Sequence, residues 1–378
     1  QLVDPFSSDK PLYSIAAKNM AQYADKLTDG AKALMKRYPT FRIDVYPSHR
    51  SVAFPKYVLD NTESCATTST VSNQGRTVKG CLAGYPFPIP KDGFEAMWNH
   101  LLRFSGRADH IKYRSYNVNG GHATLSVDAN AYEDYPYWDS AKAGTDIFYR
   151  LKLIYTGPAR RAGEQVMVMD PLDYAEKGRR AWQYLPGQRR VKLAPDIEFD
   201  TPNPGTAGAT TWDDGFVFNG SMERYNFKLI GKKEMYVPYN DYKAIFFAKQ
   251  DQLLTPNTLD PDLVRWELHR VWVVEADLLP GKRHIYSKRT FYLDEDSWAA
   301  LASDEYDAQG QLYRAAFGLE TPRYDVPSPY SDCTVQYDFI SGIYAMTAWT
   351  GEDGGIRETK PLPDLEWTPD AMAGSGIR

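Results

Sequence analysis

The sequence of 378 residues lacks the motifs that mark the common catalytic and nucleotide-binding classes of protein. It contains no HExxH pair, no Gly-x-Ser-x-Gly elbow and neither of the glycine-rich patterns GxxxxGK(S/T) and GxGxxG. Its six histidines form no close ligand pair, and no apolar run approaches the ~18 residues of a membrane-spanning helix. We therefore expect no catalytic residue, no metal site, no cofactor and no membrane-spanning helix.

An excess of positive charge is also missing. The net charge is −5 and the pI is about 5.8, which argues against nucleic acid as a partner. Residues 150–192 are the exception, with ten Lys and Arg against four Asp and Glu. This segment is either a solvated face of a sheet or a contact patch for an acidic partner or lipid head groups, which would include peripheral contact with a membrane.

Cysteine is scarce, with three residues in the whole chain. Cys65 and Cys81 flank a polar, turn-rich stretch, and a disulfide between them would indicate an oxidising compartment. The alternative is two unpaired buried thiols. We expect Cys333 to be a buried apolar side chain rather than a nucleophile. The chain starts with Gln1 and has no initiator methionine, so we expect it to be processed or trimmed.

Aromatic residues, in contrast, are abundant, at 14% of the chain. Many lie on or beside segments of alternating polarity, where a curved sheet would present large side chains on its concave face. The simpler interpretation is that they pack the sheet against its helices. Because they exceed what two helices can cover, we predict an apolar ligand cavity with ten candidate residues: Trp98, Tyr113, Tyr116, Tyr149, Trp182, Tyr184, Tyr236, Tyr239, Trp266 and Trp272.

Hydrophobic periodicity divides the chain into three parts of a single domain. Residues 1–106 form a helical and proline-rich N-terminal part, with helices predicted over 13–38 and 94–105 that cap the sheet. Residues 107–350 alternate with period two between short turns, which predicts a curved antiparallel sheet interrupted by a long loop or lid at 194–222. Residues 351–378 are predicted to be an extended tail. The fold class is mainly β (α+β).

Several stretches resemble a Gram-negative family labelled as outer-membrane lipoprotein-sorting-like. They are YPFPIPKDG at 85–93, WNH at 98–100 followed by Arg103 and Gly106, WQYLPG at 182–187 followed by RRV at 189–191, GKKEMYVPYN at 231–240, and RVWVV at 270–274. The resemblance spans about residues 45–345. It implies a secreted, periplasmic protein, with outer-membrane association as one option, and a half-open antiparallel barrel similar to the lipoprotein carriers. It also implies that the protein works together with inner-membrane efflux-type transporters and outer-membrane proteins.

Three functions follow from these features. The first is a periplasmic carrier or binding protein for a lipid-like molecule. The second is a structural adaptor that docks transporter components through the basic face at 150–192 and the proline-rich segment. The third is an enzyme for a hydrophobic or sugar substrate, with Asp213, Asp214 or His100 in its site. The family carries no established catalytic residue, so the resemblance adds none here.

Overall fold

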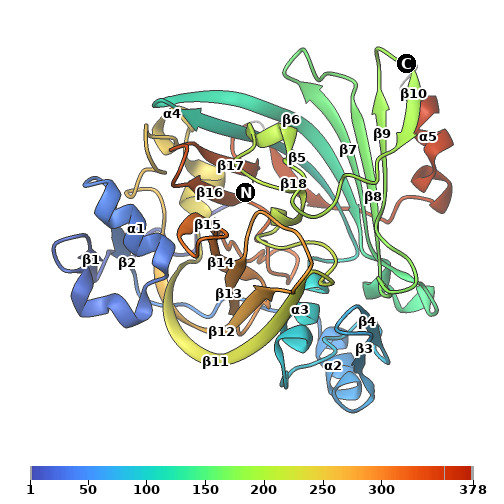
Figure 1. The fold of residues 1–378 in the computed structure, drawn as a ribbon, viewed down its shortest axis with the longest axis horizontal. Helices are drawn as coiled ribbons and strands as arrows, with labels where there is room; N and C mark the ends of the chain where they lie inside the picture. Colours follow the sequence, from blue (N-terminus) through green and yellow to red (C-terminus); the bar gives the residue numbers. More distant parts are fainter. Residues whose placement is uncertain (1, 353, 376–378) are drawn as a thin grey trace.

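The computed structural model describes residues 2–352 and 354–375, and Figure 1 shows their arrangement. In this part of the chain sixteen strands form one sheet in the order β1-β2-β12-β13-β14-β15-β16-β17-β5-β6-β7-β8-β9-β10, with β11 paired to β12 and β18 paired to β5. The strands are β1 (Tyr13–Ile15), β2 (Ile43–Val45), β5 (Ala108–Asn119), β6 (His122–Asp134), β7 (Ile147–Gly157), β8 (Gln165–Pro171), β9 (Arg180–Leu185), β10 (Arg190–Leu193), β11 (Tyr225–Pro238), β12 (Trp266–Leu278), β13 (Lys288–Asp294), β14 (Ala300–Tyr306), β15 (Leu312–Gly318), β16 (Thr334–Asp338), β17 (Tyr344–Trp349) and β18 (Gly355–Glu358).

The sheet is strongly curved, and over the described residues it does not close into a barrel. Strands β11 to β17 curl into one half, and β5 to β10 form a second, broader half (Figure 1). Neighbouring strands are antiparallel except for one bridge between Trp266 on β12 and Val45 on β2, which is parallel. The predicted fold class, a mainly β chain built on a strongly curved antiparallel sheet, is therefore confirmed.

The helices lie around the sheet. They are α1 (Asp29–Arg37), α2 (Lys56–Thr68), α3 (Gly93–Leu101), α4 (Gln250–Leu253) and α5 (Pro369–Ser375), with the 3₁₀ turns η1 (Met20–Lys26), η2 (Pro136–Trp138), η3 (Ser140–Lys142), η4 (Pro204–Thr206), η5 (Trp212–Asp214) and η7 (Asp364–Trp367), and a π-helical turn η6 (Lys243–Phe247). Within residues 2–352 and 354–375, none of the helices has the length and apolar character needed to cross a bilayer.

Helix α3 confirms its sequence signal. The Asp92 side chain accepts from the Glu95 backbone N–H at 2.9 Å, and the Glu95 carboxylate accepts from the Lys91 backbone N–H at 2.7 Å, so the first turn is capped. The prediction of one helix over 13–38 is correct only for its second half. Residues 13–15 pair as strand β1 and residues 20–26 form a 3₁₀ turn, because the strand gains a partner in β2 that local periodicity does not reveal.

Helix α2 lies outside the two helices that the sequence predicts for the N-terminal part. It buries only Val58 and Cys65, so it carries too narrow an apolar stripe to stand out in the sequence. The predicted disulfide is confirmed, since Cys65 on this helix is bonded to Cys81. Between them, β3 (Thr70–Ser72) and β4 (Thr77–Lys79) form a separate hairpin. As expected, Cys333 is free and buried.

The C-terminal segment is not merely extended. It contains β18, η7 and α5, and it lies against the outer face of β7 to β9. Arg150 donates to Asp364 at 2.8 Å and Lys152 to Glu366 at 3.2 Å, and Trp367 is buried. Two cations of the basic 150–192 segment are thus paired with the tail. Residues 376–378, the end of the predicted tail, lie outside the described residues.

Candidate functional site

A cavity of about 160 Å³ lies on the concave face of the broad half of the sheet. Alternate residues of a strand point to the same face of the sheet. Such residues from neighbouring strands lie side by side and form one wall of the cavity. The wall residues from the sheet are Ile111, Tyr113, Ser115, Val127, Ala131, Glu133, Tyr149, Leu151, Leu153, Tyr155, Val168, Thr334, Thr347 and Ala348. Most of them are aliphatic or aromatic, so the sheet side of the cavity is largely apolar.

The other wall is the segment 194–222, which we call the covering loop. Its residues Ile197, Asn203, Gly205, Thr206, Thr210, Thr211, Trp212, Asp214, Gly215, Phe216 and Asn219 face the cavity. The sequence predicted this segment as a long loop or lid, and it does lie across the concave face. It fills much of that face and leaves the cavity beneath it.

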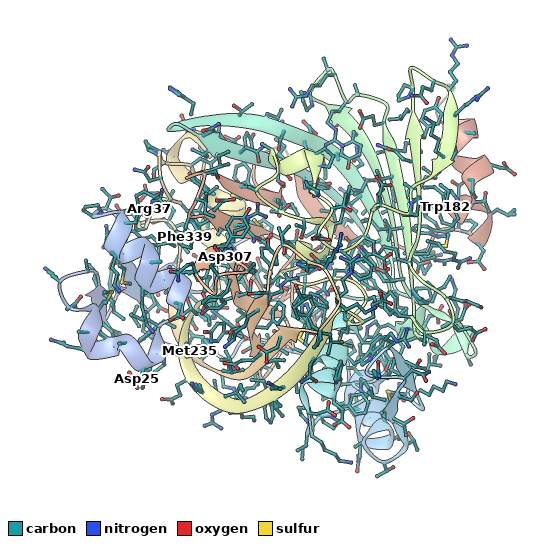
Figure 2. The ribbon with its side chains drawn as sticks, viewed as in Figure 1. Asp25, Arg37, Trp182, Met235, Asp307 and Phe339 are labelled. Carbon is teal, nitrogen blue, oxygen red and sulfur yellow. A yellow bond between two sulfur atoms is a disulfide. The ribbon has the colours of Figure 1, made fainter. Side chains whose placement is uncertain are left out.

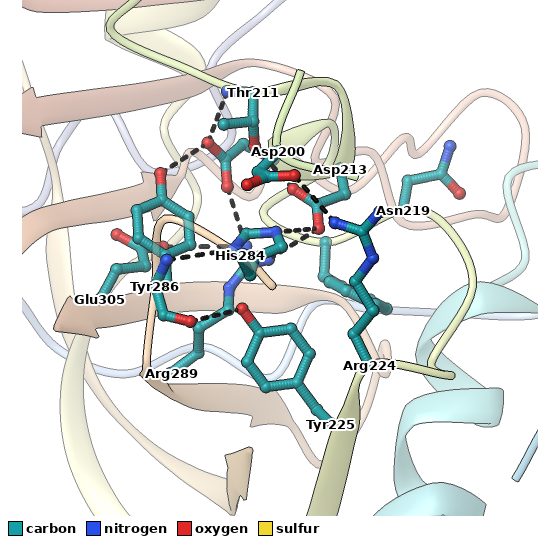
Figure 3. A network of polar contacts seen from close by, with 12 residues as sticks. Asp200, Thr211, Asp213, Asn219, Arg224, Tyr225, His284, Tyr286, Arg289 and Glu305 are labelled. Atoms are coloured by element: carbon teal, nitrogen blue, oxygen red, sulfur yellow. Dashed lines mark hydrogen bonds and ion pairs between the residues drawn. The ribbon is translucent and has the colours of Figure 1, made fainter. Parts of the chain in front are cut away.

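A buried polar network fastens the covering loop to the curled half of the sheet (Figure 3). Arg289 on β13 donates to Asp213 at 3.2 Å and to Asp214 at 2.8 Å. His284 lies 3.0 Å from Asp213, and the Tyr286 hydroxyl donates to Asp214 at 2.9 Å. Since the tyrosine backbone N–H donates to Nδ1 of His284, the Nε2–H of that ring donates to Asp213.

The neighbours of each carboxyl in this network determine whether it is charged or protonated. Burial raises the pKa of the Asp213 carboxyl, but Arg289 and His284 lower it by more, so the net pKa is below its usual value. Glu305 on β14 lies at the edge of the same network. Burial and the neighbouring Asp214 carboxylate raise the pKa of Glu305 to about 8. Within this network Asp213 therefore keeps its charge, whereas Glu305 keeps its proton up to about pH 8.

We expect protein stability to fall as the pH rises from 6.5 to 8. Burial raises the pKa of Glu305 to about 8, and burial is also the main cause that raises the pKa values of Asp109 and Glu198 to about 7. In the unfolded chain these carboxyls titrate near pH 4, so the folded protein holds more protons and loses stability as they dissociate. Burial and Arg103 lower the pKa of His100 to about 3. This histidine makes stability rise with pH, but only below its unfolded pKa of about 6.5.

The measurement is urea unfolding at pH 6.5, 7.25 and 8. We expect the free energy of unfolding to drop by about 1–3 kcal/mol over this range. Glu305→Gln removes one titrating group, so its slope should be shallower than that of the wild-type protein. A stability that is flat or rises over this range in the wild-type protein would contradict the prediction.

The cavity has an acidic end. Glu133 on β6 accepts hydrogen bonds from the hydroxyls of Tyr135 and Tyr149. Asp332, just before β16, also borders the cavity, and its side chain is buried. Among the described residues no three His, Cys, Asp or Glu side chains come together in an arrangement that could hold a metal ion.

The covering loop crosses this acidic end with a strained backbone. Phe216 and Val217 both have left-handed φ values, of 54° and 70°, which are unfavourable for side chains of this size. The Phe216 ring packs edge-on against Tyr149, and the Arg103 guanidinium lies 3.9 Å from its centre. The loop thus inserts an aromatic ring between the sheet and a buried cation.

Residues 14–373 match the family model described as Protein of unknown function (DUF1329). The chain belongs to the DUF1329 family. A relative in Pseudomonas aeruginosa, the uncharacterized protein PA3922, is 37% identical over 384 residues, which cover 100% of this chain and 84% of the relative. The predicted resemblance to the lipoprotein-sorting-like family is confirmed by the family match together with the likeness in fold to solved structures.

Among solved structures, a domain from Vibrio parahaemolyticus that bears the name outer membrane lipoprotein-sorting protein has a TM-score of 0.50 and 14% identity, over 74% of this chain and 98% of that one. A DUF1329 protein from Desulfovibrio piger has a TM-score of 0.48 and 14% identity, over 71% and 92%. A LolA superfamily protein from Nitrosomonas europaea has a TM-score of 0.40 and 12% identity, over 71% and 94%. The first of these likenesses shows a shared fold.

In this DUF1329 chain the ten predicted cavity residues do not come together. Tyr113 and Tyr149 lie on the wall of the cavity. Trp266 borders a separate apolar gap of about 20 Å³. The remaining seven pack elsewhere: Trp98, Tyr116, Trp182, Tyr184, Tyr236, Tyr239 and Trp272.

Strand alternation explains two of these placements. Trp182 pairs across the sheet with Met167, whereas Val168, the next residue, faces the cavity. Trp182 and Tyr184 therefore point to the outer face, where they meet the C-terminal segment. Figure 2 shows Trp182 at this place. The other five have aromatic partners of their own: Trp98 with Phe148, Tyr116 with Trp349, Tyr236 with Tyr13 and Tyr23, Tyr239 with His269, and Trp272 with Trp298.

The three residues named for an enzymatic site are engaged in the DUF1329 fold. Asp213 and Asp214 bind Arg289, as described above. His100 is fully buried on α3, its Nε2 lies 2.8 Å from the Phe218 carbonyl, and its Nδ1 accepts from the Ala300 backbone N–H at 3.1 Å. Both ring nitrogens thus connect α3 to the covering loop and to β14, which gives the histidine a structural role.

Proposed function

We propose that this DUF1329 protein is a periplasmic carrier that holds a hydrophobic molecule between the concave face of the sheet and the covering loop. The observation that carries the proposal is the apolar cavity at this place. Its sheet wall combines aliphatic side chains with tyrosines, and the covering loop adds threonine, asparagine and aspartate side chains; small-molecule sites likewise combine an apolar lining with polar groups. Burial of apolar ligand surface against such walls contributes about 0.8 kcal/mol per CH₂ group.

The size of the cavity indicates that the covering loop moves when a larger ligand binds. A cavity of about 150 Å³ holds one benzene molecule, and this one has about 160 Å³. An acyl chain therefore needs space that the loop now occupies. Displacement of Phe216 would open that space at the acidic end, since its ring faces the cavity and packs against Tyr149.

The disulfide bond further supports a location in the periplasm. The Cys65–Cys81 disulfide is of a kind that persists in oxidising compartments such as the periplasm. The likeness in fold to a protein named for lipoprotein sorting at the outer membrane agrees with that location. We propose that the carrier exchanges its ligand with an inner-membrane efflux-type transporter and an outer-membrane protein.

A second candidate function is that of a structural adaptor. It is favoured by exposed cations that remain on β9 and β10 after the tail has paired with Arg150 and Lys152. Arg180, Arg189, Arg190 and Lys192 are exposed at this edge of the sheet. They could hold an acidic protein surface or lipid head groups there, with no ligand in the cavity.

A cavity-filling variant tests the carrier function. Ala131 lies on the cavity wall, and Ala131→Phe would place a ring in the space that a ligand needs. We expect native mass spectrometry of the protein purified from a Gram-negative periplasm to detect a bound apolar species, which solvent extraction then identifies. Ala131→Phe should retain about tenfold less of it.

Ala123→Phe is the matched control, because Ala123 is exposed at the other end of the same strand, β6. It should carry as much ligand as the wild-type protein. A wild-type protein that carries no apolar molecule, and takes up none when fatty acids, alcohols or phospholipids are offered, would refute the carrier and favour the adaptor.

A further inference from the structure

The acidic end of the cavity contains a carboxylate oxygen that lacks a partner. Asp332 is 5% exposed, and its Oδ1 has no hydrogen-bond partner among the described residues. A buried acceptor without a donor costs about 1–3 kcal/mol, so natural proteins rarely keep one unless a ligand or a water satisfies it. Because Asp332 borders the cavity, a bound molecule can supply the missing donor.

Neighbouring protein groups do not meet this need. Arg103 is the cation that lowers the Asp332 pKa most, but it donates to the His100 carbonyl and lies over the Phe216 ring. Arg323 lies 3.0 Å from Asp109. The hydroxyl of Tyr149, which points to this end, already donates to Glu133.

The other charged groups on the cavity wall are neutralised by partners outside it. Arg179 forms a paired contact with Asp170, at 2.7 and 2.9 Å, and Asp214 is held by Arg289. The ionisable acidic groups left to meet a ligand are thus the carboxyls of Asp332 and Glu133. An anionic ligand would lose its hydration in this apolar setting and find no unpaired cation on the described wall, which is unfavourable.

We infer that the cavity selects hydrophobic molecules that carry a hydroxyl group, which donates to Asp332 while the apolar part of the molecule lies against the β5–β8 wall. The inference rests on the proposed carrier function and specifies its ligand class. A neutral hydroxyl suits this end better than an ammonium group. Burial and the adjacent Glu133 raise the pKa of the Asp332 carboxyl, and a protonated carboxyl can still bond a hydroxyl as donor or acceptor.

The test uses the delipidated full chain and four ten-carbon probes that differ only at one end: 1-decanol, methyl decanoate, decanoate and decylamine. Dissociation constants are measured at pH 7.5 by displacement of a fluorescent apolar dye. We expect 1-decanol to bind about tenfold tighter than the methyl ester, which has no donor, and than decanoate.

Asp332→Leu should remove this preference while leaving the affinity for methyl decanoate unchanged. Since it deletes an unpartnered buried carboxyl, its melting temperature should not fall below that of the wild-type protein. Thr347→Val is the matched control. Thr347 also lines the cavity, but its hydroxyl is bonded to Thr334 at 2.8 Å, so the variant should keep the preference for the alcohol.

The outcomes separate this inference from the carrier function. If methyl decanoate or decanoate binds as tightly as 1-decanol, or if Asp332→Leu keeps the preference, the hydroxyl selection is overturned and the carrier function stands. If decylamine binds tightest, the cavity selects a cation and the inference is again overturned. If none of the four probes displaces the dye or binds in native mass spectra, the carrier function itself is refuted, and the inference with it.

Discussion

Replacement of Arg289 by methionine is expected to lower the free energy of unfolding by about 3–5 kcal/mol. Arg289 is fully buried and is the cation that holds both Asp213 and Asp214. Its removal leaves two buried carboxylates without the cation that binds both of them. Urea unfolding followed by fluorescence measures the loss.

The control for Arg289→Met is the triple variant Arg289→Met, Asp213→Asn and Asp214→Asn. It removes the charges together, so it should regain at least half of the lost stability, because buried ion pairs are costly mainly when one partner is missing. If the single variant unfolds with the wild-type free energy, Arg289 does not anchor the covering loop. Limited proteolysis should then also show no new cleavage within residues 194–222.

Replacement of Trp98 by alanine is expected to destabilise the protein by about 3–5 kcal/mol. Trp98 is fully buried on α3, where its ring packs edge-on against Phe148 and its Nε1–H donates to the Gly75 carbonyl at 2.7 Å. The substitution deletes the largest side chain of this helix and leaves both a cavity and an unpaired carbonyl. Denaturant unfolding is the measurement.

Trp98→Phe separates the two contributions. It keeps an aromatic ring but loses the hydrogen bond, so it should cost less than the alanine variant by at least 1 kcal/mol. The prediction that Trp98 lines a ligand site competes with this interpretation. A melting temperature that Trp98→Ala leaves unchanged would contradict the core role and place Trp98 at a ligand or at the surface.

The long strands of the sheet were predictable because each carries its own signal. Alternation of polarity and short glycine turns identify β5 and β6 before any partner is known, and the register of the hairpin follows from its turn. Long-range pairing leaves no such local signal. Residues 13–15 become a strand only because β2 lies beside them, and α2 is held by a disulfide and two buried side chains, Val58 and Cys65.

The cavity was predictable only in part, for a related reason. Two of its aromatic members, Tyr113 and Tyr149, were found by residue type, which also selected aromatics that face the outer side of the sheet and missed Tyr155, Trp212 and Phe216. Of the polar residues on its wall, only Asp214 was named from the sequence, and for an enzymatic site. Glu133 shares the face of Val127 and Ala131 by alternation, so a closer reading of β6 could have found it. Asp332 lies outside any periodic segment, and nothing in its neighbours along the chain indicates where it lies.

Arg289 lies between Lys288 and Thr290 at the start of β13, so its neighbours along the chain give no sign that it is buried and needs a partner. The identity of that partner could not be read. Asp213 and Asp214 were noted as an acidic pair in a loop, but more than seventy residues separate them from Arg289. Which loop covers which face is decided by packing over the whole chain.

The left-handed pair Phe216 and Val217 limits how firmly the covering loop can stay closed. Each such residue costs about 1–2 kcal/mol in this backbone conformation, and a loop that has moved away can relax both. Opening therefore returns energy that partly offsets the loss of contacts with Arg103 and Tyr149. The free energies of the closed and open states of the covering loop therefore differ by less than its buried ion pairs would suggest. Such a small difference lets a protein bind its cargo and still hand it on without an external energy source.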